Sequence, residues 1–124
     1  MPPMESSNLN QQAVMWGPNG HTQTGDKKVL AGIELDVRWE DLAFTDRPLK
    51  GDEAEFDAKV VVRQDVAVGS IFWQGKESEL PDPVTTVDTL YEVTSFRKTP
   101  DVKGRNFRRV CYLNKWSDTL PAIG

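Results

Sequence analysis

Hydrophobic and charged residues alternate along residues 31–41, which read Ala-Gly-Ile-Glu-Leu-Asp-Val-Arg-Trp-Glu-Asp. A period of two is typical of a β-strand with one face in a core and the other in solvent. The core face is predicted to carry Ile33, Leu35, Val37 and Trp39. The outer face is predicted to carry Glu34, Asp36, Arg38 and Glu40.

Other short strand patterns follow along the chain, separated by glycine and proline. We expect strands within residues 13–16, 29–41, 56–63, 70–74, 90–96 and 106–113. The run Val60-Val61-Val62 is β-branched on both faces, which indicates a strand packed on both sides. Little of the chain has helical spacing. The pattern therefore predicts an all-β fold, a small antiparallel β-barrel with a long inserted loop and extended N- and C-terminal segments.

The 124 residues are enough for one domain with a small core. Residues 1–28 are polar and rich in turn residues, so we expect a weakly packed and partly irregular N-terminal extension. The barrel is predicted over 29–113, interrupted by a loop at 41–55, and a tail follows over 114–124. A loop of this length between two strong strands is typical of a functional or disordered segment.

Charge is distributed unevenly around the formal net charge of -4. Residues 40–57 hold seven acids against Arg47 and Lys50, a net of -5, and residues 97–115 hold seven bases against Asp101, a net of +6. A subunit with an acidic and a basic end suits head-to-tail contacts with its own copies or a charged neighbour. The alternative is that both are simply solvated faces.

The candidate chemistry is sparse. The single histidine, His21, has no second histidine or cysteine at ligand spacing, which argues against a zinc site or a serine triad. Cys111 sits in a hydrophobic strand pattern and is interpreted as a small core residue. No signal peptide or apolar run of membrane-spanning length is seen. We therefore expect no enzymatic activity, no metal and no cofactor, and a protein made in the cytoplasm or in a particle assembled there.

Several blocks, in their order, resemble one known family. They are Ala-Val-Met-Trp-Gly-Pro at 13–18, the strand at 33–41, Ala-Lys-Val-Val-Val at 58–62, Asp-Val-Ala-Val-Gly at 65–69, and residues 91–113 with the turn Lys-Thr-Pro-Asp-Val-Lys-Gly at 98–104. Together they cover about residues 10–113, and they resemble the head-tail joining proteins of tailed bacteriophages, also called head-closure, head-completion or stopper proteins.

The resemblance implies a virion neck protein that forms a cyclic ring, a hexamer or dodecamer, below the portal and adaptor. Such a ring closes the DNA exit channel and presents a surface to tail proteins, and it meets packaged DNA only in the channel lumen and no membrane. The loop implied to point into the channel includes Asp41, Phe44, Thr45, Asp46, Arg47, Lys50, Asp52, Glu53 and Glu55. Docking to neighbouring subunits or neck proteins is assigned to Arg38, Glu40, Arg97, Lys98, Lys103, Arg105, Arg108, Arg109 and Trp116.

Two other functions fit the same residues. One is a tail-terminator ring elsewhere in the virion. The other is a small barrel that binds single-stranded nucleic acid through Phe107, Tyr112 and the basic strand, because aromatic and cationic side chains alternate there. In a small barrel, however, Phe96, Phe107 and Tyr112 are more typical of core residues.

Overall fold

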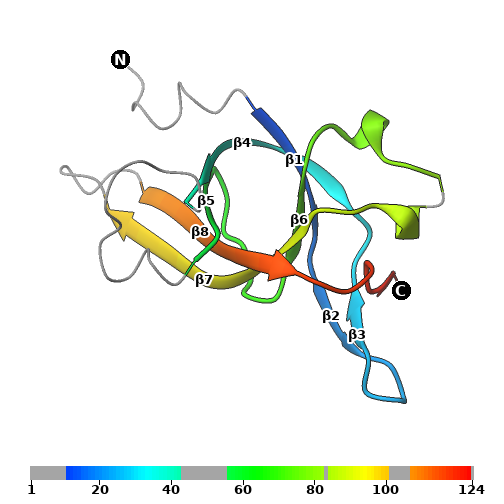
Figure 1. Ribbon diagram of the computed structural model, residues 1–124. Coiled ribbons are helices and arrows are strands. Elements are labelled where there is room, and N and C mark those ends of the chain that lie inside the picture. Colours follow the sequence, from blue (N-terminus) through cyan, green and yellow to red (C-terminus); the bar gives the residue numbers. More distant parts are fainter. Residues whose placement is uncertain (1–10, 43–55, 83, 101–106, 124) are drawn as a thin grey trace.

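Six strands close into an antiparallel barrel (Figure 1). The computed structural model describes residues 11–42, 56–82, 84–100 and 107–123. The barrel strands, in spatial order, are β1 (Gln11–Trp16), β4 (Ile33–Asp41), β5 (Ala58–Val62), β8 (Phe107–Trp116), β7 (Leu90–Pro100) and β6 (Ile71–Gln74). The predicted small all-β barrel is confirmed.

A second, smaller sheet lies beside the barrel. It consists of β2 (Pro18–His21), β3 (Lys27–Val29) and β9 (Ala122–Ile123), with β3 and β9 parallel. Figure 1 shows β2 and β3 extending away from the barrel, with the C-terminal end of the chain beside them. Two short 3-10 helices, η2 (Glu77–Glu79) and η3 (Val84–Thr86), stand between β6 and β7.

The barrel interior is filled by the inward-facing residues of all six strands, and most of them have almost no exposed surface. Its members are Ala13, Met15, Leu35, Val37, Trp39, Ala58, Val60, Val62, Phe72, Tyr91, Val93, Cys111 and Leu113, together with Val66 from the β5–β6 connection. The alternation predicted for Leu35, Val37 and Trp39 is confirmed. It fails at Ile33, which is 45% exposed. Ile33 is the first residue of β4, and a period of two does not reveal where a strand passes the rim of its sheet.

A second core lies outside the barrel wall, because β1 is buried on both of its faces. Val14 and Trp16 pack there with five residues of other elements, which are Ile71 of β6, Leu90 of β7, Val29 of the small sheet, Val87 of the β6–β7 connection and Leu120 of the tail. The expectation that residues 1–28 form a weakly packed extension is therefore wrong for β1. The barrel begins at Gln11 rather than at residue 29.

The observed strand boundaries also differ from those predicted, most clearly in three strands. The strand predicted over 29–41 is divided into β3 and β4. Gly32 lies in the break and passes so close to Trp16 that a Cβ atom would stand 2.8 Å from the indole Nε1. The last two barrel strands are longer than the predicted 90–96 and 106–113, and β8 takes in residues 114–116 of the predicted tail. Burial of Val60, Val61 and Val62 confirms that β5 is packed on both faces.

Candidate functional site

The first candidate region is the end of the barrel where β4 leads into β5. The Leu42 amide donates to the Asp57 carbonyl at 3.0 Å, and Asp41 pairs with Ala58 across the two strands. The Trp39 indole Nε1 donates to Asp41 Oδ1 at 3.0 Å. The Trp39 ring meets Tyr91 edge to face, with centroids 5.2 Å apart. The chain is thus held against the barrel wall both where it leaves β4 and where it enters β5.

Two carboxylates give this end its electrostatic character. Asp57 accepts a hydrogen bond from the Lys115 amide at Oδ2, 2.8 Å away, and its own amide donates to the Leu113 carbonyl. Burial raises the pKa of the Tyr91 hydroxyl above its ordinary value, and the negative charges of Asp41 and Asp57 raise this pKa further. The two carboxylates therefore place negative charge beside Tyr91 at the base of the connection.

Only one residue predicted for the channel loop is described by the structure. Asp41 is the last residue of β4. The others lie outside the described residues: Phe44, Thr45, Asp46, Arg47, Lys50, Asp52, Glu53 and Glu55.

The second candidate region is the far end of the β7–β8 hairpin. Lys98 pairs with Arg109, Thr99 with Arg108, and Pro100 with Phe107. The pairing of β5 with β8 ends at Val62 and Arg109. Among the described strand pairs, the hairpin therefore continues past its neighbour as a two-stranded ribbon. The pairs that lie past β5 are Thr99–Arg108 and Pro100–Phe107, while Val110 and Arg109, the partners of Arg97 and Lys98, are still joined to β5. We call residues 97–100 and 107–109, which span both parts of the hairpin, the basic ribbon.

Cationic side chains lie on both faces of the basic ribbon. On one face, Arg109 donates from Nε to Asp65 Oδ1 at 2.8 Å, and the Lys98 ammonium lies 3.4 Å from the same carboxylate. Both cations also approach the Phe107 ring, at 4.6 Å for Lys98 and 5.8 Å for Arg109. On the other face, the Arg97 guanidinium lies 5.1 Å from the Tyr112 ring centroid. The hydrogen bond from Arg109 lowers the pKa of the Asp65 carboxyl, and Lys98 adds to this effect.

The outer wall of the barrel brings four predicted docking residues together. Arg38, Val61, Val110 and Arg97 form one row across β4, β5, β8 and β7. Alternation along the strands places Glu40 and Arg108 on the same outer face as this row, and Glu40 forms an ion pair with Lys59 at 3.4 Å. Lys98 and Arg109 lie on the opposite face of the ribbon. Lys103 and Arg105 are outside the described residues.

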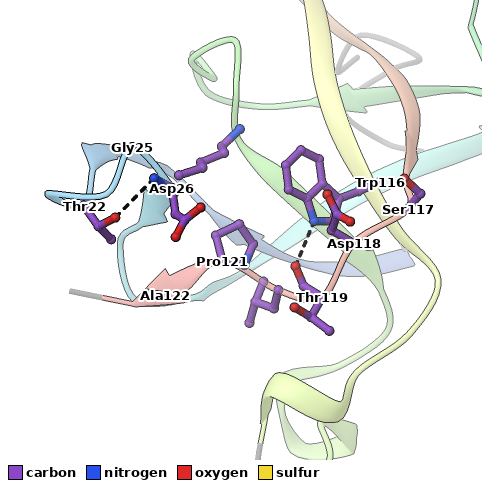
Figure 2. A pocket seen from close by; sticks show the side chains of 11 residues that line it. Thr22, Gly25, Asp26, Trp116, Ser117, Asp118, Thr119, Pro121 and Ala122 are labelled. Atoms are coloured by element: carbon purple, nitrogen blue, oxygen red, sulfur yellow. Dashed lines mark hydrogen bonds between the residues drawn. The ribbon is translucent and has the colours of Figure 1, made fainter.

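Trp116, the remaining predicted docking residue, packs within its own chain. Its ring lies against the second core, and its Nε1 donates to the Thr119 carbonyl at 2.9 Å. The Lys27 ammonium lies 5.2 Å from the ring centroid and forms an ion pair with Glu92 at 2.7 Å. Figure 2 shows Trp116 on one side of an open cavity of about 800 Å³, between the β2–β3 turn and the C-terminal segment.

Phe96, Phe107 and Tyr112 were interpreted above as either core residues or nucleic-acid-binding residues. Two of them are packed, and one is exposed. Tyr112 is 8% exposed and packs with Val61 and Val110, and Phe96 is partly buried against the barrel interior. Phe107 is 44% exposed. Cys111 is fully buried, which confirms its interpretation as a core residue and raises the pKa of its thiol to about 12.

Four charged residues, Asp65, Lys27, Glu92 and Lys59, were not identified as ion-pair partners by sequence reasoning. Asp65 lies 33 residues from Lys98 and 44 residues from Arg109, so no local pattern could have indicated the contact. The same is true of Lys27 and Glu92, which are 65 residues apart. Lys59 carried a weak signal, because it is the only charged residue within the apolar run of β5.

Neither a metal site nor a membrane-spanning helix is found in the part of the chain that the structure describes. No three histidine, cysteine, aspartate or glutamate side chains in that part lie together as a metal ion would require. None of its helices has the length and apolar character needed to cross a bilayer. His21 is exposed in β2.

Comparison with known proteins does not assign this chain to a family. No protein-family model, no curated protein and no solved structure gives a significant match to this chain.

Proposed function

We propose that this chain is a structural neck protein of a tailed-phage virion, a ring subunit that closes the DNA exit channel below the portal and adaptor and presents a docking surface to the tail. The observation that carries the proposal is the barrel end between β4 and β5. There a closed wall holds both ends of a long acidic connection at Trp39, Asp41, Leu42 and Asp57.

A rigid base suits a segment that must block a channel. The strand pair Asp41–Ala58 and the hydrogen bond from Leu42 to Asp57 fix the two points between which residues 43–55 run. Most charged residues of that segment are acidic. Like charge keeps DNA from adhering to such a segment, while a ring of copies still obstructs the channel sterically.

The distribution of charge supports assembly from head to tail. Along β5 and β8, the pair Ala58–Leu113 lies at the acidic end, and the pair Val62–Arg109 lies at the basic ribbon. Unlike surfaces at opposite ends of one subunit form heterologous contacts, and heterologous contacts generate a ring when the rotation closes.

The central test is electron microscopy of the purified protein mixed with portal and adaptor proteins, combined with its mass in solution. We expect a ring of copies stacked below the adaptor. Because subunits of sequential assemblies are often monomeric before they meet their platform, a monomer alone does not contradict the proposal. A protein that never joins the portal–adaptor complex does.

The role of the connection is tested in particles. Deletion of residues 45–54 should give particles that lose their DNA before tails attach. A matched variant replaces the same ten residues with glycine and serine, which keeps the length and removes the acidic charge. If particles with the deletion retain their DNA, the connection does not close the channel.

The docking role of the basic end is tested by charge reversal. Arg105→Glu with Arg108→Glu should weaken ring or neck assembly, with a loss that depends on salt concentration. Lys76→Glu is the control, because Lys76 is exposed beyond the end of β6 and outside the predicted docking set. Unchanged assembly of the double variant would remove the basic end from the interface.

A further inference from the structure

We propose that the basic ribbon binds the phosphate backbone of nucleic acid. This inference concerns the free subunit, because in the proposed ring the same basic end docks on a neighbour. It rests on three features: the extension of the hairpin past β5, cations on both of its faces, and a carboxylate that competes for two of them.

The described end of the ribbon is narrow enough to enter a groove of nucleic acid. This end is two strands wide, because Thr99–Arg108 and Pro100–Phe107 pair beyond the last residues joined to β5. A two-stranded β-ribbon fits the major groove of duplex DNA, and cationic arms also enter the minor groove. The wall of a closed barrel is too broad for either groove, so the extension past the barrel is the part with the necessary access.

The charges of the ribbon match phosphates on more than one side. Arg97 and Arg108 are exposed on the outer face, and Lys98 and Arg109 keep 36% and 23% of their side-chain surface exposed on the other. A flat acidic surface would meet the cations of one face only, whereas the phosphates of nucleic acid can reach cations on both faces.

Asp65 behaves as an internal competitor for the same cations. Its carboxylate pairs with Arg109 and Lys98 while 63% of its own side-chain surface is exposed. An exposed ion pair contributes little to stability and exchanges readily. A phosphate group can therefore replace this carboxylate, and removal of Asp65 should increase the affinity for nucleic acid.

The net charge of -4 predicts that this binding is weak at physiological salt, since the rest of the molecule repels a polyanion. The experiment therefore starts at low salt. Fluorescence anisotropy would follow binding of the full chain to a labelled 30-base-pair DNA duplex and to one of its single strands. A polyglutamate peptide of similar length serves as the acidic-protein probe.

Binding of the duplex or the single strand is expected to weaken linearly with the logarithm of salt concentration. The double variant Arg97→Ala, Arg108→Ala should reduce the magnitude of that slope by about two, one for each lost phosphate contact. Lys115→Ala is the matched control, because Lys115 is an exposed cation at the opposite end of the same strand. It should leave the slope unchanged.

Asp65→Asn is expected to increase the affinity for nucleic acid, an effect that a folding defect would not produce. It should raise the affinity about twofold to fivefold, which corresponds to the strength of an exposed ion pair. The two nucleic-acid probes identify the source of the phosphates, since the slope per contact is steeper for duplex than for single strands.

Three results would overturn the proposal: no binding of either nucleic acid at low salt, an equal loss in the Lys115 control, or equally tight binding of polyglutamate. The last would assign the ribbon to an acidic protein partner. Failure here leaves ring assembly with portal and adaptor unaffected, so the two proposals are tested separately.

Discussion

The two ends of the β5–β8 strand pair differ in how their polar groups are held. At the β4–β5 end, the carboxylates of Asp41 and Asp57 accept hydrogen bonds from the Trp39 indole and the Lys115 amide beside a buried ring. At the basic ribbon, Arg109 and Lys98 share one exposed carboxylate. The first end is built for a fixed geometry, and the second keeps its charges accessible to a partner.

The largest expected difference between the ends is in stability. Trp39→Ala should lower the free energy of unfolding by about 3–5 kcal/mol, because it empties a buried site and removes the contact with Tyr91. Phe107→Ala, at the exposed ribbon, should cost less than about 1 kcal/mol. Urea unfolding of both variants measures this difference. Equal losses would mean that the ribbon is as much a part of the core as the β4–β5 end.

Cys111 lies on β8 between the two ends, and the reactivity of its thiol reports whether the barrel interior is closed there. Its burial and a pKa of about 12 predict that a thiol reagent at pH 8 modifies the native protein about a thousandfold more slowly than a thiol with its ordinary pKa of 9.0. The rate of colour release from Ellman's reagent measures this, with the urea-unfolded chain as the control. Fast native labelling would show that the barrel opens beside the ribbon.

Tyr91 provides a pH test of the β4–β5 end. Its pKa is raised in the folded state, so the stability linked to its neutral form is complete below the unfolded pKa of about 10 and is lost as the pH rises through the folded value. Tyr91→Phe should remove this part of the alkaline loss. Urea midpoints from pH 8 to 11 compare the two proteins. Parallel curves would mean that Tyr91 does not titrate against Asp41 and Asp57.

The smallest effect is expected at Asp65, on the ribbon. Its lowered pKa means that the linked stability is present above the ordinary pKa of 3.8 and is lost as the pH falls through the folded value. NMR titration of this carboxyl should give a midpoint below 3.8 that returns toward 3.8 in 1 M salt, because salt screens exposed pairs. A midpoint that does not respond to salt would indicate a buried pair instead.

The sequence was most informative where the physical signal is local. Leu35, Val37 and Trp39 alternate with charged residues over one strand, and that period alone places them in the interior. The same rule misplaces Ile33, because the rim of a barrel is set by where the neighbouring strands end. The burial of β1 on both faces was not predicted, because its second face is covered by Leu120 and Val87, which come from the far half of the chain.

The candidate site was less predictable for the same reason. The pairing of Asp65 with Arg109 depends on the register between β5 and β8, which places Arg109 opposite Val62, and no pattern within a short window contains it. Sequence did indicate that Arg97, Lys98, Arg108 and Arg109 form a basic segment. Alternation puts neighbouring residues such as Arg97 and Lys98 on opposite faces, but which of them faces outward depends on the register shift between Val93 and Ser95.

The strand order of the barrel also has a consequence for how the barrel closes. β6, β1, β4 and β5 can pair with one another without the last two barrel strands, which leaves one open edge on β5 and another on β6. The β7–β8 hairpin satisfies both edges at once, since β8 pairs with β5 and β7 pairs with β6. The hairpin that carries the basic ribbon is therefore also the element that closes the barrel. A substitution that weakens its pairing acts on both open edges of the sheet, on β5 and on β6.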